Sequence, residues 1–111
     1  MPNQGEVSGV RDLLRDDVVW HTLSGDVHGV ERVLAMLAQS DEIASGTILR
    51  EVHALFANDE YGMVLVTVRA ERQGRRFEDR QVHVYRFRGG RIAEFWLFPG
   101  DRQANEEFWA L

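Results

Sequence analysis

The second half of the chain alternates hydrophobic and polar residues in four runs, and this alternation predicts a β-sheet. The runs are rich in the β-branched and aromatic residues that suit a pleated surface. They are TILREVHALFA from Thr47, MVLVTVRAER from Met63, RFEDRQVHVYRFR from Arg76 and RIAEFWLF from Arg91. The turn-forming segments NDEYG, QG and GG separate them. Connections this short join antiparallel neighbours, so we expect a four-stranded meander.

Helical spacing occurs only outside these runs. Four hydrophobic residues recur at i, i+3, i+4 and i+7, namely Val30, Val33, Leu34 and Leu37. They predict an amphipathic helix over residues 29–39, with Asp26 at its cap and a polar loop over residues 40–46. Near the other end of the chain, Asp101 is placed to cap a last helical turn whose shared face is Ala104, Phe108 and Leu111.

The N-terminal segment carries weaker signals. We expect residues 1–9 to be a polar arm and residues 10–111 to form one domain. Val10, Leu13 and Leu14 favour a short helix at about 9–15 with Ser8 as its cap. The hydrophobic residues 18–20 predict a short strand, and the segment SGDVHG that follows reads as a turn-rich break.

Helices followed by a long antiparallel sheet indicate the α+β class. One helix of this length covers only part of a curved four-stranded sheet. The rest of that face must then be covered by a partner or loops, or left as a pocket.

Composition narrows the classes of function. The net charge is −5, all 13 basic residues are arginine, and they form no extended basic cluster, so we expect no nucleic-acid partner and no membrane partner. No run approaches the ~20 hydrophobic residues that a membrane span needs. The chain has no cysteine, and its four histidines are scattered, so we expect no metal and no cofactor. A cytoplasmic protein is the expectation.

The last two strand-like runs form one hairpin around Gly89-Gly90, and its register decides which side chains face inward. In a two-residue turn, His83 lies opposite Trp96. In a type I turn with a bulge at Gly90 the pairing shifts by one residue, which exchanges every side chain between the faces. One face then holds six residues: His83, Tyr85, Phe87, Ala93, Phe95 and Leu97.

Several motifs together form a recognisable pattern: DDVVWH before a Gly-led helix, then VHVYRFRGGRIAEFW and a closing Asp. The pattern covers about residues 10–110 and is most specific in G-R-I-x-E-x-W, from Gly90 to Trp96. It resembles the SnoaL-like group, which is related to ketosteroid isomerase, polyketide cyclases, limonene epoxide hydrolase and nuclear transport factor two. The resemblance implies a curved antiparallel sheet wrapped by helices into a cystatin-like cone, with a deep apolar pocket and frequent homodimers. Such proteins usually begin with a long helix, which here is lost or truncated.

The resemblance favours the bulged register, because the family's pocket groups lie on the face that holds His83. His83 aligns with a protonated Asp of ketosteroid isomerases and with a His of SnoaL-type cyclases. That neutral acid donates a hydrogen bond to an oxyanion, and imidazole can donate similarly or exchange protons. His83 is therefore the first catalytic candidate. The alternative is a strand histidine satisfied by a backbone or side-chain partner.

The positions of the family's catalytic acids do not hold acids in this chain. The cyclase and epoxide-hydrolase acid falls on Leu97, and the isomerase acid falls on Thr22, which would need a neighbouring base. The epoxide-hydrolase Arg-Asp pair has only a weak counterpart in Arg69 and Glu71. Asp101 is the second catalytic candidate, as a substitute acid, and its alternative role is a helix cap worth ~1 kcal/mol.

Five residues are the predicted ligand-binding set: Trp20, Thr22, Tyr85, Phe95 and Leu97. Strand alternation allows only one of Trp20 and His21 to point inward, and we expect Trp20 to do so. Tyr85 either offers a phenol hydrogen bond to a ligand or is an aromatic core residue with a solvated hydroxyl. Glu94 and Trp96 then lie on the outer face, in an interface or a surface pair.

Three functions follow as hypotheses. The first is a protein that binds a small apolar or aromatic molecule, with isomerase- or cyclase-type proton transfer on a carbonyl compound if it is an enzyme. The second is a non-catalytic module with a vestigial pocket, forming a homodimer through the outer sheet face around Val82, Val84 and Trp96. The third is an epoxide hydrolase-like enzyme.

Overall fold

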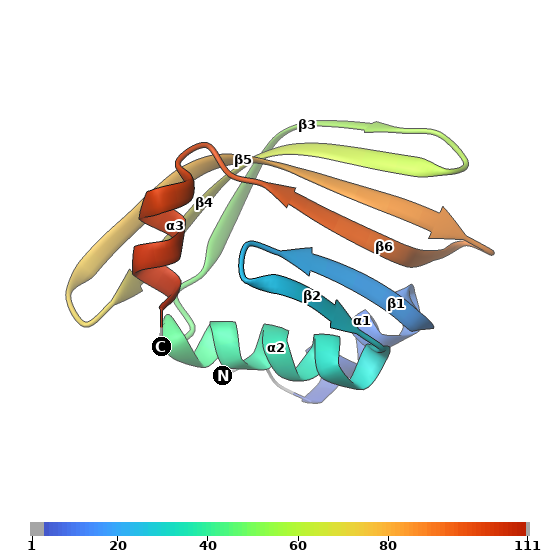
Figure 1. Ribbon diagram of the computed structural model, residues 1–111, viewed down its shortest axis with the longest axis horizontal. Coiled ribbons are helices and arrows are strands. Elements are labelled where there is room, and N and C mark those ends of the chain that lie inside the picture. Colours follow the sequence, from blue (N-terminus) through green and yellow to red (C-terminus); the bar gives the residue numbers. More distant parts are fainter. Residues whose placement is uncertain (1–3, 111) are drawn as a thin grey trace.

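Six strands form one curved sheet in the order β2-β1-β6-β5-β4-β3, and three helices lie against it (Figure 1). The structure, a computed structural model, describes residues 4–110. The strands are β1 (Leu14–Thr22), β2 (Gly25–His28), β3 (Leu49–Ala57), β4 (Tyr61–Arg72), β5 (Arg75–Arg88) and β6 (Arg91–Phe98). The helices are α1 (Gln4–Leu13), α2 (Val30–Ile43) and α3 (Arg102–Trp109). The predicted α+β class and the curved sheet wrapped by helices are confirmed.

The predicted meander is confirmed, and two further strands extend it. Strands β3 to β6 pair antiparallel in sequence order. β1 pairs in parallel with β6, and β2 pairs antiparallel with β1 at the edge of the sheet. The turn-rich break expected at SGDVHG is wrong in its centre, because Gly25–His28 pairs as a strand. The parallel pair is possible because most of the chain lies between β1 and β6 and serves as the crossover.

The first two helices differ from expectation at their ends. α1 begins at Gln4, so most of the segment expected as a polar arm is helical, and Ser8 lies inside the helix rather than at its cap. α2 continues to Ile43, through part of the expected loop. Gly29 occupies the N-cap of α2 and no side chain caps it, because Asp26 is in β2 and contacts His21 instead.

The third helix confirms the predicted cap. The Asp101 carboxylate accepts a hydrogen bond from the Ala104 backbone N–H at 2.9 Å. Phe108, on the expected face, is buried, whereas Leu111 lies outside the described residues.

The β5–β6 hairpin has the favoured register but reaches it through another turn. His83 lies opposite Leu97, as the bulged register requires. Gly89-Gly90 is nevertheless a two-residue turn, with φ of 61° and 78°, the positive values that a type I′ turn needs. The bulge expected at Gly90 is wrong in position: the pairing shifts further along β6, where Ala93 is the extra residue.

The hydrophobic core is divided into two clusters on the inner face of the sheet, which is the face covered by α2 and α3. The first cluster lies under α3 and contains Ala44, Val66, Val68, Ala70, Phe77 and Phe108. The second lies under α2 and contains Leu14, Val18, Val30, Val33 and Leu34. Burying each large side chain stabilises the fold by about 1.5–3 kcal/mol. A strip of buried residues on β5 and β6 belongs to neither cluster, and it holds the candidate site.

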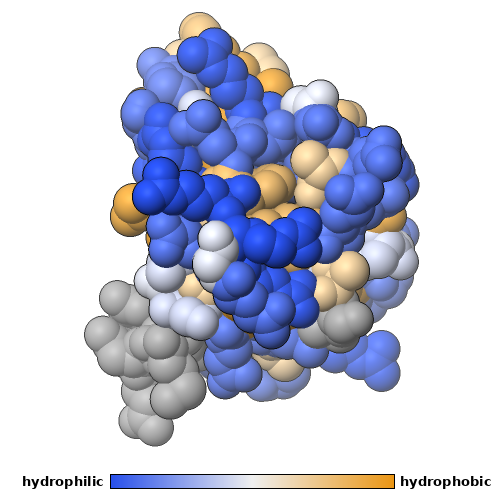
Figure 2. All heavy atoms as spheres, turned by 90° about the vertical axis from the view of Figure 1, so that its left-hand side faces the viewer, coloured by the Kyte–Doolittle hydropathy of each residue, from blue (hydrophilic) through white to orange (hydrophobic). Residues whose placement is uncertain are grey.

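The end of the molecule that carries α3 and the β4–β5 turn is mostly hydrophilic, with hydrophobic side chains visible between the charged ones (Figure 2). Among residues 4–110, none of the helices is both long and hydrophobic enough to span a lipid bilayer.

Candidate ligand site on the inner face

Four aromatic rings from three strands meet around Phe95, and we call them the aromatic cluster. Trp20 stacks on Phe95 with ring centroids 4.0 Å apart. Tyr85 tilts against the same ring at 5.1 Å, and His83 meets its edge at 5.3 Å. The pairings of β6 explain this meeting, because Phe95 lies beside Trp20 of β1 and opposite Tyr85 of β5. The prediction that Trp20 points inward is confirmed by its packing against the cluster under α2.

A row of side chains crosses the inner face through His83. Leu97 is directly opposite His83 on one side, and Val64 is directly opposite on the other. Leu55 of β3 continues the row next to Val64 and is 65% exposed. The helices therefore leave the β3 side of the inner face open to solvent, whereas His83 itself is only 7% exposed.

Thr22 does not join the other predicted ligand-binding residues through its hydroxyl group. That hydroxyl donates a hydrogen bond to the Gly25 carbonyl oxygen at 2.6 Å, within the β1–β2 turn. The other four residues of the predicted ligand-binding set lie together with His83. Their role in binding stays a prediction.

A chain of buried polar side chains runs from the start of α3 to His83, and we call Asp79, Gln81, Asn105 and His83 the polar chain. His83 Nε2 lies 2.8 Å from Gln81 Oε1. Gln81 Nε2 donates to Asp79 Oδ2 at 3.2 Å and to Asn105 Oδ1 at 2.9 Å. All four residues are under 9% exposed, so these bonds satisfy groups that would otherwise be costly to bury.

The environment keeps the His83 imidazole neutral at ordinary pH. Burial, and secondarily the positive charge of Arg50, lower the pKa of His83 to about 4. Burial also raises the pKa of the Tyr85 hydroxyl, an effect that Arg50 partly opposes. The site therefore offers two uncharged polar groups among hydrophobic neighbours.

Asp101 directs its carboxylate at the first turn of α3 rather than leaving it free. The side chain caps the helix, and the backbone N–H of Asp101 donates to Asp79 Oδ1 at 3.0 Å. Its catalytic role stays a prediction. Arg69 lies on the outer face with its side chain bound to Glu78 and Glu51, so it does not face the aromatic cluster.

His21 points to the outer face, as alternation from Trp20 requires, and it bridges two carboxylates. Nδ1 lies 2.7 Å from Asp26 Oδ1, and Nε2 lies 2.6 Å from Glu94 Oε2. The Glu94 hydrogen bond is the main cause that raises the pKa of His21, and the same bond is the main cause that lowers the pKa of Glu94. Arg86 Nε also donates a hydrogen bond to Glu94 Oε1 at 3.0 Å, so Glu94 forms the predicted surface pair.

The SnoaL-like domain family matches residues 2–95 of the chain. The chain belongs to that family. A curated relative, an uncharacterised protein of Mycobacterium tuberculosis, is 32% identical to this SnoaL-like domain over 91 residues, which are 81% of this chain and 70% of the relative.

Solved structures share the fold of this SnoaL-like domain at lower identity. Bal32a, from a soil-derived mobile gene cassette, superposes with a TM-score of 0.88 at 24% identity, covering 95% of this chain and 85% of Bal32a. A protein assigned as a SnoaL-like polyketide cyclase from Jannaschia sp. CCS1 superposes with a TM-score of 0.79 at 14% identity, covering 98% of this chain and 82% of the other. These similarities show a shared fold.

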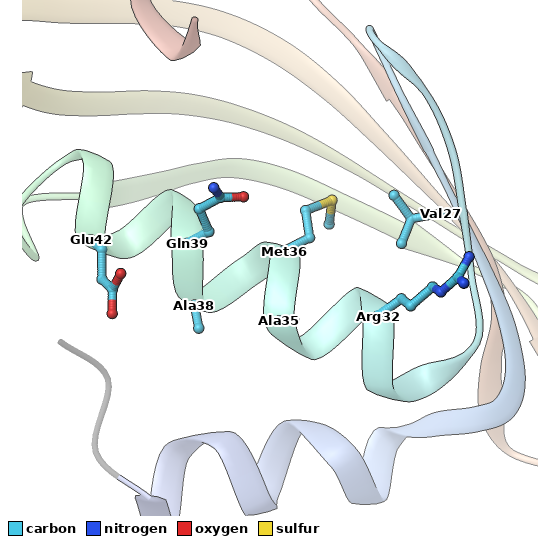
Figure 3. A pocket seen from close by; sticks show the side chains of 7 residues that line it. All are labelled: Val27, Arg32, Ala35, Met36, Ala38, Gln39 and Glu42. Atoms are coloured by element: carbon cyan, nitrogen blue, oxygen red, sulfur yellow. The ribbon is translucent and has the colours of Figure 1, made fainter. Parts of the chain in front are cut away.

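The SnoaL-like domain also has a hollow of ≈ 760 Å³ away from the aromatic cluster (Figure 3). Its lining comes from α2, apart from Val27 of β2: Val27, Arg32, Ala35, Met36, Ala38, Gln39 and Glu42. None of these residues belongs to the aromatic cluster or the polar chain. Within residues 4–110, no three His, Asp or Glu side chains lie close enough together to hold a metal ion.

Sequence reasoning missed three members of the polar chain. Asp79 and Gln81 have the same strand parity as His83, so two polar residues on an otherwise hydrophobic face were a usable signal. Asn105 gave no such signal, because only the packing of α3 against β5 brings it to Gln81.

Proposed function

We propose that this SnoaL-like domain binds a small apolar or aromatic molecule on the inner face of the sheet. The aromatic cluster and Leu97 provide the hydrophobic contacts, and His83 and the Tyr85 hydroxyl provide the polar ones. The observation that carries the proposal is a nearly buried, neutral imidazole among aromatic rings, next to a row that is open at Leu55. Few polar groups within hydrophobic walls are typical of small-molecule sites.

If the bound molecule reacts, the class of reaction that we propose is isomerase- or cyclase-type proton transfer on a carbonyl compound. His83 supports this class, because the lone pair of a neutral imidazole can accept a proton from the bound molecule. Two structural neighbours are assigned as polyketide cyclases, which is consistent with that class. Leu97 cannot act as an acid or base, so the proton transfer falls to His83.

A ligand screen with a matched pair of tryptophan variants tests the binding site. We would measure unfolding temperatures with a panel of aromatic and terpenoid compounds, since a ligand at 100 times its Kd stabilises a fold by about 2.7 kcal/mol. Trp20→Leu changes the inner face, and Trp96→Leu is its control on the outer face. We expect Trp20→Leu to weaken binding and Trp96→Leu to leave it unchanged. No stabilisation by any compound, or equal losses in both variants, would refute the site.

A second candidate function, a homodimer-forming module, has its own supporting observation. The outer face carries large hydrophobic side chains that are exposed in the single chain, including Phe56 at 57% and Phe98 at 53%. Met63 and Leu65 lie between them on the same face. A two-fold axis would bury this surface against its own copy.

Sedimentation tests that candidate. We expect the protein to sediment as a dimer, and Met63→Lys to shift it toward the monomer, since a charge would be placed in the interface. Leu13→Lys is the control, because Leu13 is also exposed but lies at the end of α1. A strict monomer at high concentration would remove the candidate.

A further inference from the structure

We propose that the polar chain holds His83 as the Nε2–H tautomer, so that Nδ1 accepts a hydrogen bond from a hydroxyl group of the bound molecule. The statement about the ligand rests on the proposed function, whereas the statement about the tautomer does not. The ligand class that follows is an aromatic or apolar body that carries a phenol or enol hydroxyl.

Asp79 anchors the polar chain at the start of α3. Its carboxylate accepts hydrogen bonds from the backbone N–H groups of Gly100 and Asp101 at 3.1 and 3.0 Å, and from Asn105 Nδ2 at 2.7 Å. Asn105 Nδ2 also donates to the Asp101 carbonyl oxygen at 2.8 Å. Both partners of Nδ2 are acceptors only, so the orientation of the Asn105 amide is determined.

The Gln81 amide has a determined orientation as well. Its Nε2 group faces two oxygens, Asp79 Oδ2 and Asn105 Oδ1. A flipped amide would place the Gln81 side-chain oxygen against Asp79 Oδ2 and Asn105 Oδ1. Neither of these contacts would then contain a hydrogen to share. Gln81 Oε1 therefore faces His83.

The ring proton of His83 is on Nε2. Gln81 Oε1 is an acceptor only, so the bond of 2.8 Å requires a hydrogen on His83 Nε2. The ring is neutral at ordinary pH, because burial and Arg50 hold its pKa to about 4. A neutral imidazole has one N–H, and therefore Nδ1 keeps a free lone pair.

The other ring nitrogen, Nδ1, is accessible to a ligand. Nδ1 makes no hydrogen bond among the described residues. Within the same residues, no fully buried side-chain nitrogen or oxygen lacks a partner. Nδ1 therefore keeps some solvent-accessible surface, on the ring whose edge neighbour is Phe95.

The chemistry that fits is a donor rather than an oxyanion. In this tautomer Nδ1 cannot donate, so the oxyanion-donor role implied by the family resemblance does not suit His83. A carbonyl or ether oxygen would set lone pair against lone pair, whereas a hydroxyl group would complete the acceptor. The rings of Trp20 and Phe95 supply contact for an aromatic body.

The tautomer is tested in the free protein by nitrogen-15 NMR of the histidine side chains. We expect His83 to show a protonated Nε2 and an unprotonated Nδ1 near neutral pH. Gln81→Leu removes the acceptor and should give a mixture of tautomers, while Gln103→Leu, on the exposed side of α3, should not. A proton on Nδ1, or no response to Gln81→Leu, would overturn the assignment.

The ligand class is tested with naphthol and its methyl ether, which differ in whether the oxygen can donate. We expect naphthol to bind about tenfold more tightly than its methyl ether, because only naphthol can donate a hydrogen bond to His83 Nδ1. This preference should disappear in His83→Phe. Equal affinities, or tighter binding of the ether, would overturn the proposed acceptor. Failure of both compounds to bind would count against the proposed function and its ligand class, while the NMR result would still decide the tautomer.

Discussion

Acidification provides a direct test of how His83 is held. In the folded protein the pKa of His83 is lowered to about 4 from its ordinary 6.5. As the pH falls below 6.5, the unfolded chain takes up a proton that the folded chain does not, so the free energy of unfolding decreases. The contribution of His83 is therefore present above pH 6.5 and is lost as the pH falls toward 4.

The size of the effect follows from the pKa difference. Each tenfold change in proton affinity is worth about 1.4 kcal/mol, so the whole difference is worth about 3 kcal/mol. Between about pH 7 and about pH 4.5, the linkage relation gives a loss of about 2 kcal/mol. For a small domain of marginal stability, this is a large fraction of the total.

The assay is denaturant unfolding at both pH values, followed by tryptophan fluorescence. The reference is His83→Gln, whose amide can still donate to Gln81 but does not titrate in this range. Other groups titrate equally in both proteins, so their effects cancel in the comparison. One of them is Glu94, whose lowered pKa gives a stabilising contribution that is lost as the pH falls below its ordinary value. We expect the wild type to lose about 2 kcal/mol more than the variant. A constant difference between the two proteins would refute the placement of a buried, neutral His83.

The remaining predictions concern single side chains. Gly100→Ala should destabilise the fold by about 1–3 kcal/mol in a thermal melt, since its Cβ would lie 2.5 Å from the Arg80 carbonyl oxygen; Gly9→Ala, with open space around it, should be neutral or stabilising. Asp101→Asn should keep both stability and ligand affinity, because Asn also caps helices; a loss of turnover with intact binding would instead support a catalytic acid. In the wild type, the protonated His21 stabilises the fold at low pH, and this contribution is lost as the pH rises through the raised pKa of His21. His21→Gln should show no such loss when denaturant unfolding is measured over the same pH range.

The sheet was predictable where its pattern is local. Alternation and short turns determine the meander from β3 to β6. Alternation alone leaves two registers open for the hairpin that holds His83, and the family resemblance decides between them. β2 escaped prediction because Gly25 and Asp26 are poor strand formers, and its pairing with β1 supplies the structure. The position of the bulge escaped because Gly90 is the residue that suggests one, whereas Ala93 carries it.

The candidate site, too, was predictable only where its residues depend on local sequence pattern. Tyr85 and Phe95 follow from the hairpin register. The stacking of Trp20 on Phe95 depends on a parallel pairing between the two ends of the fold, for which the sequence holds no local signal. The bond from Gln81 to Asn105 depends likewise on the docking of α3.

The parallel pairing of β1 with β6 also has a consequence for folding during synthesis. β1 leaves the ribosome early, but its neighbour in the sheet, Arg91–Phe98, is among the last segments to appear. Until then the hydrophobic side chains of α2 and β1 can pack on each other, on α1 and on β2, but not on β6. Contacts between such distant segments must also wait for closure of a long loop, which slows folding. Chains stalled before β6 would therefore expose an unpaired edge of β1. That edge is covered only when β6 is added to the sheet.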